Sequence, residues 1–409
     1  MKRLCLLLAA LAIFALPASA AEPIKLGFSM SLTGGLANTG RVALAAMKLW
    51  ESGINDKGGL LGRPVTLVYY DDQSDPANVP AIYTKLLDID HVDLVVGPYS
   101  TKQTAPAMPT IMEHKMVFMG LSAININAHF HYPRYFSMTS TGSDPNAMFS
   151  KGFFSVAMRQ SPKPKTVAFV GGDIEFSQSV LSAARRIAKE AGLKTVYDKS
   201  YPPGTADYAP IIRAIQAANP DILYMASYPQ GSVGLVRAIH EVGYKPKMVG
   251  GATVGLNNVS IEMQLGPLLN GIVGYATWLP TMNFPGVQGV LKRYQAEAKA
   301  QGLDPLGWGM VPPAYASVQA MGEAVEGAHS LDQGKIAKWL HTHTVQTVFG
   351  KISFGPDGEW TKGRMPIVQY RNITGKTEDQ FVDLKHLPII DPPDLKTADL
   401  IYPFAKALQ

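Results

Sequence analysis

Short apolar, β-branched runs alternate along the chain with longer segments whose apolar residues recur at the helical period. In the segment 208–218, for example, the apolar residues at 208, 211, 212 and 215 share one face of a helix, with Thr205 and Asp207 available as caps. Strands are predicted at 24–30, 65–70, 92–96, 116–119, 166–170, 195–197, 222–226, 248–249 and 272–276. Helices are predicted between them, at 42–54, 78–87, 178–191, 208–218 and 233–242. Continuous apolar strands joined by helices indicate parallel sheets that are covered on both faces.

The chain passes through this plan twice. Residues 62–101 read as strand, Asp-rich turn, helix, strand and polar turn, and residues 192–230 repeat that order with few identities. The repetition predicts an α/β fold of two doubly wound, Rossmann-like lobes that meet near residues 137–144. The later part of the chain adds predicted helices at 285–301, 310–326 and 332–342, and predicted strands at 350–354 and 367–371. No low-complexity linker separates the lobes, so we expect several chain crossings between them.

The first twenty residues have the features of a secretory signal peptide. Met1-Lys2-Arg3 precedes an apolar stretch, and the small residues Ala18-Ser19-Ala20 suit cleavage before Ala21. Cys5 is the only cysteine and lies inside this segment, so the mature chain forms no disulfide and carries no thiolate. Cleavage would also remove two basic residues and lower the formal charge from +5 to +3. We therefore expect an exported protein that is stabilised by burial of its core.

Charge and motif content argue against several classes of protein. So mild a charge, without a basic run, argues against nucleic acid or an anionic membrane surface as partner. The chain has no G-x-S-x-G elbow, no P-loop, no G-x-G-x-x-G and no H-E-x-x-H. We therefore expect neither an enzyme nor a cofactor.

No metal site is expected either. The two close histidine pairs, at 129/131 and 341/343, lack the further converging ligands that a metal needs. The Asp-rich segment 71–75 lacks the glycine and the distal glutamate of a calcium loop. Its carboxylates are better placed to cap a helix that begins near Pro76.

Polar turns follow several predicted strands, at the sheet edge where open parallel sheets bind ligands. They occupy residues 97–104, 171–177, 227–232 and 250–257. The first contains Tyr99, Ser100 and Thr101 at the start of a helix, and a helix N-terminus with flanking hydroxyls suits a carboxylate or another anion. Simple capping of that helix is one alternative. A secreted hydrolase that uses Ser100 or Thr101 with a histidine such as His131 is another.

A family resemblance becomes specific at this point. Residues 24–76, IKLGFSMSLTGGLANTGRVALAAMKLWESGINDKGGLLGRPVTLVYYDDQSDP, and residues 92–101, VDLVVGPYST, resemble the branched-chain amino-acid-binding proteins of ABC transporters. Residues 205–228, TADYAPIIRAIQAANPDILYMASY, continue the resemblance over essentially the whole mature chain. It implies a type I periplasmic binding protein, located in the periplasm, whose lobes close on a small solute and which docks on a membrane permease. The implied division is 22–141 plus 276–362 for lobe 1 and 142–275 plus 363–409 for lobe 2.

The resemblance also implies a set of solute contacts. The turn at residues 99–101 would hold a carboxylate through backbone amides and a hydroxyl, a role that Thr101 fits. Ala123 stands where the family prefers a hydroxyl, and Phe176 where tyrosine is frequent; Tyr228 would be a second aromatic wall. The predicted ligand-binding residues are Tyr99, Ser100, Thr101, Leu121, Ser122, Ala123, Phe176, Tyr228, Ala252 and Met310.

One position departs from the amino-acid-binding pattern. Family members that bind amino acids typically carry an acidic residue, which neutralises the ligand's ammonium, where this chain has Ala252. Burying an ammonium without its partner costs about 3–5 kcal/mol. At about 1.4 kcal/mol per factor of ten, binding would weaken roughly a hundred- to several-thousand-fold. We therefore expect a carboxylic acid with an aromatic or hydrophobic body. Its apolar walls are expected from Tyr99, Phe176, Tyr228, Trp278 and Met310.

Two other functions fit the same fold. The protein could bind a branched-chain or other hydrophobic amino acid if Asp173 or Glu175 supplied the charge that is missing at Ala252. It could also be an exported ligand-sensing protein, since the signal peptide argues only against a cytoplasmic regulator.

Overall fold

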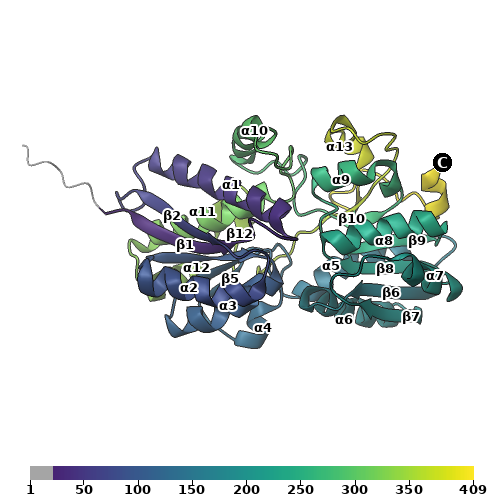
Figure 1. Ribbon diagram of the computed structural model, residues 1–409, viewed down its shortest axis with the longest axis horizontal. Coiled ribbons are helices and arrows are strands. Elements are labelled where there is room, and N and C mark those ends of the chain that lie inside the picture. The colour runs from purple at the N-terminus through teal and green to yellow at the C-terminus, as the bar shows by residue number, and fades with distance from the viewer. Residues whose placement is uncertain (1–21) are drawn as a thin grey trace, which may run out of the picture.

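The computed structural model describes residues 22–409, which form two α/β lobes side by side (Figure 1). The predicted signal peptide, residues 1–20, lies outside the described residues. Within the described part of the chain, no helix has both the length and the apolar character needed to cross a membrane.

Lobe 1 is built on a five-stranded parallel sheet. Its strand order is β2 (Val65–Asp71), β1 (Ile24–Met30), β3 (Leu94–Tyr99), β4 (Phe118–Leu121) and β5 (Tyr135–Ser137). One face packs on α1 (Ala37–Asn55), α10 (Val287–Ala298), α11 (Val311–Ala328) and α12 (Gln333–Thr342). The other face packs on α2 (Val79–Thr84), α3 (Thr101–Glu113) and α4 (Ile126–Phe130). Neighbouring residues of β3 face opposite cores, because successive side chains of a strand alternate between its two faces.

Lobe 2 is built on a seven-stranded mixed sheet. Its strand order is β14 (Ile389–Asp391), β13 (Ile367–Gln369), β10 (Val273–Tyr275), β9 (Met248–Thr253), β8 (Ile222–Ser227), β6 (Thr166–Gly172) and β7 (Lys194–Tyr201). Strand β13 pairs antiparallel with both of its neighbours. One face packs on α5 (Pro145–Met158) and α6 (Glu175–Glu190). The other packs on α7 (Ala209–Ala217), α8 (Pro229–Val242) and α9 (Val259–Leu265), with the short α13 (Asp379–Val382) nearby.

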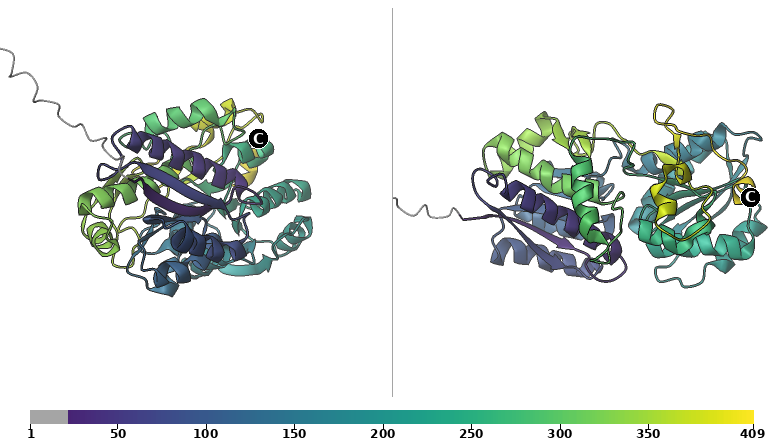
Figure 2. Two further views of the ribbon diagram at one scale, coloured as in Figure 1. Left: turned by 60° about the vertical axis from the view of Figure 1, so that its left-hand side comes forward. Right: turned by 90° about the horizontal axis from the view of Figure 1, so that it is seen from above.

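The chain passes between the lobes three times, at residues 138–144, 276–286 and 353–366, and Figure 2 shows such segments joining the lobes. The first and third crossings are bonded together. The indole N–H of Trp360 donates to the Ser137 carbonyl at 2.8 Å, and the Arg364 N–H donates to the Ser140 carbonyl at 2.7 Å. These bonds join the crossings into one hinge region.

Most predicted elements are present, and β1 has the predicted bounds. The predicted helix 78–87 consists instead of a 3₁₀ turn (Pro76–Asn78), α2 and a π-helical turn (Lys85–Ile89). The strand predicted at 350–354 is shorter, and as β12 (Gly350–Ile352) it pairs with β11 (Val345–Thr347) in a separate hairpin. The capping expected from the Asp-rich segment is confirmed, because the Asp75 carboxylate accepts from the Ala77 N–H at 3.0 Å.

Candidate functional site

A narrow cavity of about 60 Å³ lies between the lobes, at the carboxyl ends of their parallel strands. Both lobes contribute to its wall. Of the predicted ligand-binding residues, the wall contains Tyr99, Ser100, Ser122, Phe176, Tyr228 and Met310. Wall residues that the sequence did not single out include Thr39, Thr139, Phe149, Tyr275, Asp304 and Met365. The polar turns of two distant segments therefore meet at one site, as expected for an open α/β fold.

The polar end of the cavity is formed where β3 leads into α3. The pairing of β3 with β4 shifts register between Val96 and Tyr99, because Pro98 has no N–H to donate to the ladder. Ser100 then adopts φ +88°, a region that only glycine enters without strain. Its Oγ is buried without a hydrogen-bond partner among the described residues, so Ser100 does not cap α3 through its side chain.

The first-turn amides of α3 directly follow Ser100 in the chain. The N–H groups of Thr101, Lys102 and Gln103 have no intrahelical acceptor, since an α-helix satisfies its donors only from the fourth residue onward. A helix N-terminus also carries a partial positive charge. Together with the free Ser100 hydroxyl, these amides can bind a carboxylate.

Tyr228 approaches this polar end from lobe 2. It lies in the turn between β8 and α8, and its hydroxyl is buried without a hydrogen-bond partner of good geometry. Burial raises the pKa of the Tyr228 phenol, and the nearby Ser100 hydroxyl and Lys102 N–H oppose the rise. Burial likewise raises the pKa of Tyr99 to about 12. Both phenols therefore stay protonated at neutral pH and are available as hydrogen-bond donors.

The lobe 2 side of the cavity is aromatic. The ring of Phe176 stacks on Tyr228 with centroids 5.5 Å apart, and packs edge-on against Phe149 at 5.5 Å. Phe149 packs edge-on against Tyr275 at 5.0 Å. Such a continuous aromatic surface favours an apolar or aromatic body in the ligand.

Four predicted contacts lie outside the cavity wall. The Thr101 Oγ1 accepts from the Ile124 N–H at 3.1 Å, so it braces the turn after β4. Leu121 and Ala123 are fully buried in the lobe 1 cores, and Ala252 is fully buried in the core of lobe 2. Trp278, expected as an apolar wall, is also outside it and donates its indole N–H to the Met282 carbonyl at 2.8 Å.

Neither acidic residue proposed for an ammonium lines the cavity. Both side chains are exposed, and Glu175 lies in the first turn of α6. Burial raises the pKa of Glu175, and the nearby His129 opposes that rise.

Asp304 is the carboxylate of the described cavity wall, and the sequence did not single it out. It lies in the loop between α10 and α11. Its Oδ1 accepts from the N–H groups of Leu306 at 3.0 Å and Gly307 at 2.6 Å, and its Oδ2 accepts from the Val259 N–H of lobe 2. Burial raises the pKa of Asp304, and these amides oppose the rise. The Asp-Pro-Leu-Gly turn is the local signal that could have indicated this residue.

The structure also bears on metal binding and hydrolysis. Within residues 22–409, no group of three or more His, Cys, Asp or Glu side chains converges in a way that could hold a metal ion. The Ser100 hydroxyl makes no hydrogen bond to a histidine in the described chain. A serine nucleophile needs such a base within reach, so the geometry does not favour the hydrolase alternative.

Comparisons with known proteins agree with this arrangement. The profile of the periplasmic binding protein family matches residues 23–377. The leucine-, isoleucine-, valine-, threonine- and alanine-binding protein of Pseudomonas aeruginosa is 26% identical over 383 residues, which cover 92% of this chain and 98% of the relative.

Two solved structures share the fold. The branched-chain amino acid transporter substrate binding protein LivJ from Streptococcus pneumoniae, in complex with isoleucine, has a TM-score of 0.73 at 19% identity, covering 87% of this chain and 97% of LivJ. An ABC transporter solute binding protein from R. palustris, in complex with 4-hydroxybenzoate, has a TM-score of 0.73 at 19% identity, covering 87% of this chain and 94% of that protein. With its two lobes and a cavity between them, this chain belongs to the periplasmic binding protein family and has the type I fold.

Proposed function

We propose that the protein is the solute-binding component of an ABC importer and carries a small aromatic or hydrophobic carboxylate to its permease. One observation carries this proposal: an unpartnered Ser100 hydroxyl beside the free amides of α3 faces an aromatic wall of the opposite lobe. Hydrogen bonds to a charged group contribute about 1.5–3 kcal/mol each. The polar end therefore suits the carboxylate, and the aromatic wall suits the apolar body of the ligand.

The surroundings of the cavity offer little to an ammonium group. Ala252 is apolar and buried, and both oxygens of Asp304 already accept backbone N–H groups. The solved relative that holds 4-hydroxybenzoate supports the view that this fold can enclose an aromatic acid.

The lobes would have to separate before such a ligand enters. The cavity of about 60 Å³ is smaller than the roughly 150 Å³ that encloses one benzene. The Tyr228 hydroxyl also stands beside the amides and the hydroxyl that would receive the carboxylate. We infer that the ligand binds lobe 1 in an open form, and that lobe 2 then closes over it by rotation about the crossings.

A second candidate is a hydrophobic amino acid, because Asp304 lines the cavity and the Pseudomonas aeruginosa relative is named for amino acids. In that case the buried Asp304 carboxylate, rather than Asp173 or Glu175, would face the ammonium. Its three amide donors already stabilise its charge, which favours the carboxylic acid.

Matched ligands separate the two candidates. Leucine and 4-methylpentanoate differ by one amino group, and benzoate and 4-hydroxybenzoate sample the aromatic class. Protein freed of bound solute by unfolding and refolding would be tested by thermal shift and calorimetry. Ligand at a hundredfold its dissociation constant stabilises by about 2.7 kcal/mol, which raises the melting temperature measurably. We expect leucine to bind at least a hundredfold more weakly than 4-methylpentanoate. Tighter binding of leucine would establish amino-group recognition instead.

Export to the periplasm and docking on a permease complete the proposal, and neither requires catalysis. An exported sensor of the same fold would bind the same ligands without supporting uptake. Deletion of the gene, followed by measurement of radiolabelled ligand uptake into whole cells, distinguishes the two roles, because only a transport component is needed for uptake.

A further inference from the structure

A second pocket, of about 430 Å³, lies away from the interlobe cavity. Leu279 and Thr281 of the 276–286 crossing form one side, and Arg371 and Asn372 after β13 form another. The rest of the wall comes from residues 384–398, beyond residue 377 where the family match ends. Its volume falls in the range of about 300–1,000 Å³ that is typical of small-molecule sites.

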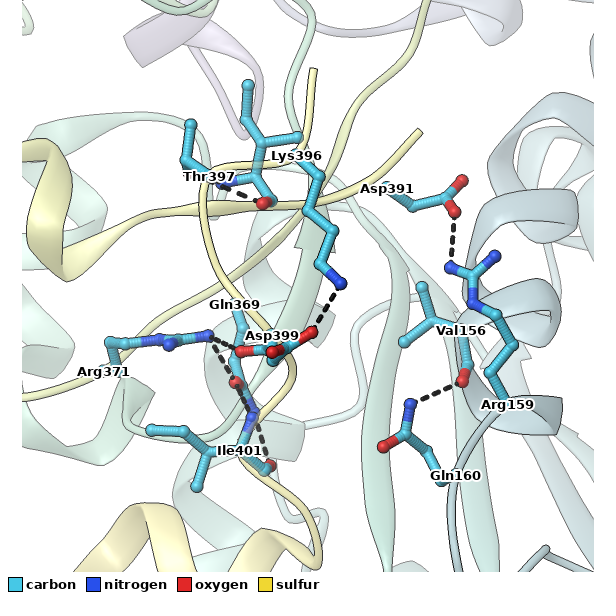
Figure 3. A network of polar contacts seen from close by, with 11 residues as sticks. Val156, Arg159, Gln160, Gln369, Arg371, Asp391, Lys396, Thr397, Asp399 and Ile401 are labelled. Atoms are coloured by element: carbon cyan, nitrogen blue, oxygen red, sulfur yellow. Dashed lines mark hydrogen bonds and ion pairs between the residues drawn. The ribbon is translucent and has the colours of Figure 1, made fainter. Parts of the chain in front are cut away.

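Arg371 is a buried cation in this wall. It is 9% exposed, and its Nη2 donates to the Gln369 Oε1 at 3.0 Å and to the Asp399 carbonyl at 2.8 Å, as Figure 3 shows. Its Nε is buried without a partner. Within the described chain, no carboxylate lies within 4.0 Å of its guanidinium; the nearby Asp399 carboxylate is exposed and pairs with Lys396. A guanidinium stays charged and is rarely buried unpaired, so Arg371 lacks an anion.

The rest of the pocket combines a second cation with aliphatic walls. The exposed Lys385 is among the lining residues, and no acidic side chain is among those described. The apolar part of the wall comes from Leu279, Leu384, Leu387, Pro388, Ile389 and Ala398. Thr281, Asn372 and Thr397 add neutral polar groups. Two cationic residues beside aliphatic surface match an anion that carries a short hydrocarbon body.

We propose that this pocket is an accessory binding site for a small organic anion, whose carboxylate or phosphate pairs with Arg371 and Lys385 and whose aliphatic body packs on Leu279, Leu387 and Ile389. The site is separate from the interlobe cavity and does not depend on the ligand proposed for it.

Methyl NMR of the full mature chain tests the site with sodium hexanoate as the probe. The methyl groups of Leu387 and Ile389 report on this pocket, and those of Met310 and Met365 report on the interlobe cavity, so the two sites are read separately. We expect saturable shifts at Leu387 and Ile389, and at least tenfold weaker binding of hexanol, which has the same body without the charge. Butyl phosphate distinguishes the two anion sources: tighter binding than hexanoate identifies phosphate as the preferred head group, and weaker binding identifies carboxylate.

Variants of the pocket test which cations bind the charged group of hexanoate. Arg371→Gln should weaken hexanoate binding at least tenfold, and Ala398→Trp should block it by filling the pocket. Lys385 is exposed, so Lys385→Gln should not disturb folding. It should weaken hexanoate binding about threefold, and it tests the proposal even if Arg371→Gln does not fold. Arg185→Gln, which removes a cation paired with Asp198 elsewhere on lobe 2, is the matched control and should change nothing. Shifts that do not saturate, equal affinity for hexanol, or binding unchanged in Lys385→Gln and Ala398→Trp would each overturn the proposal.

Discussion

The two walls of the interlobe cavity differ in how closely they are tied to folding. On lobe 1, the Ser100 hydroxyl has no partner in the described chain, so it contributes nothing by side-chain bonding to the folded state. On lobe 2, Phe176 belongs to the core under the β-sheet, and Tyr228 packs against the cores of both lobes. Ligand recognition and stability are therefore separable on lobe 1, whereas on lobe 2 the same side chains serve both.

Among single substitutions in the cavity wall, the largest expected effect is on lobe 2. Phe176→Ala should lower the free energy of unfolding by about 3–5 kcal/mol, because it removes a buried ring and leaves a cavity. It should also weaken binding of an aromatic acid. Urea unfolding and calorimetry measure the two effects, and Phe176→Leu is the control that keeps most of the volume. A change in affinity without a change in stability would contradict the double role of this wall.

The matching change on lobe 1 should affect binding alone. Ser100→Ala should weaken carboxylate binding by about 1.5–3 kcal/mol, since it removes a hydrogen bond to a charged group. The melting temperature of the ligand-free protein should stay the same. Ser177→Ala is the control, because Ser177 is also buried with an unpartnered hydroxyl but does not line the cavity. Equal losses of affinity in Ser100→Ala and Ser177→Ala would show that the Ser100 hydroxyl does not bind the ligand.

Stability should fall with rising pH because of two buried carboxyl groups, one in the third crossing and one in lobe 2. Burial raises the pKa of Glu359, in the third crossing, and of Glu262, in α9 of lobe 2, to about 8 each. Between the usual carboxyl pKa and about 8, the folded state holds protons that the unfolded state has released, so stability is present below this window and is lost as pH rises through it. The slope should approach about 1.4 kcal/mol per pH unit for each group.

Glutamine variants show which of the two glutamates causes the pH dependence of stability. Urea unfolding between pH 5 and pH 8 should show that Glu359→Gln and Glu262→Gln each remove about half of the pH dependence, since Gln is a neutral isostere of the protonated acid. The Tyr370 hydroxyl donates to the Glu262 Oε1 at 2.6 Å, and we expect the glutamine of Glu262→Gln to accept the same hydrogen bond. A slope that survives in the double variant would show that other groups cause it.

The smallest expected effect separates the ring of Tyr228 from its hydroxyl. Tyr228→Phe keeps the stacking on Phe176 and removes a hydroxyl that has no good partner in the ligand-free protein, so stability should not fall. Affinity for a carboxylate should decrease by about 1 kcal/mol, as for the loss of one ordinary hydrogen bond. Calorimetry of Tyr228→Phe beside Tyr275→Phe, another phenol of the wall, measures the contribution of the Tyr228 hydroxyl itself.

Local pattern was sufficient for most of the fold and for part of the site. Apolar runs between helical segments predicted the parallel strands, and the polar turn after one of them predicted Ser100 in the cavity wall. The family resemblance predicted Tyr228 there. Elements without a clear local signal were missed. Helix α5 is rich in apolar residues on several sides, so its period is weak, and β5 and β14 are only three residues long.

Only the tertiary structure decided which polar groups are free. Thr101 and Ser100 are equivalent in the sequence, yet Thr101 bonds the Ile124 amide while the Ser100 hydroxyl has no partner. Asp304 lies far along the chain from Val259, and folding brings its carboxylate to that amide and to the cavity. The sequence by itself determined the elements and the sheet edge, because both depend on the local order of apolar and polar residues. The availability of each donor and acceptor depends on partners that are distant in the chain, and only packing of the lobes brings those partners into contact.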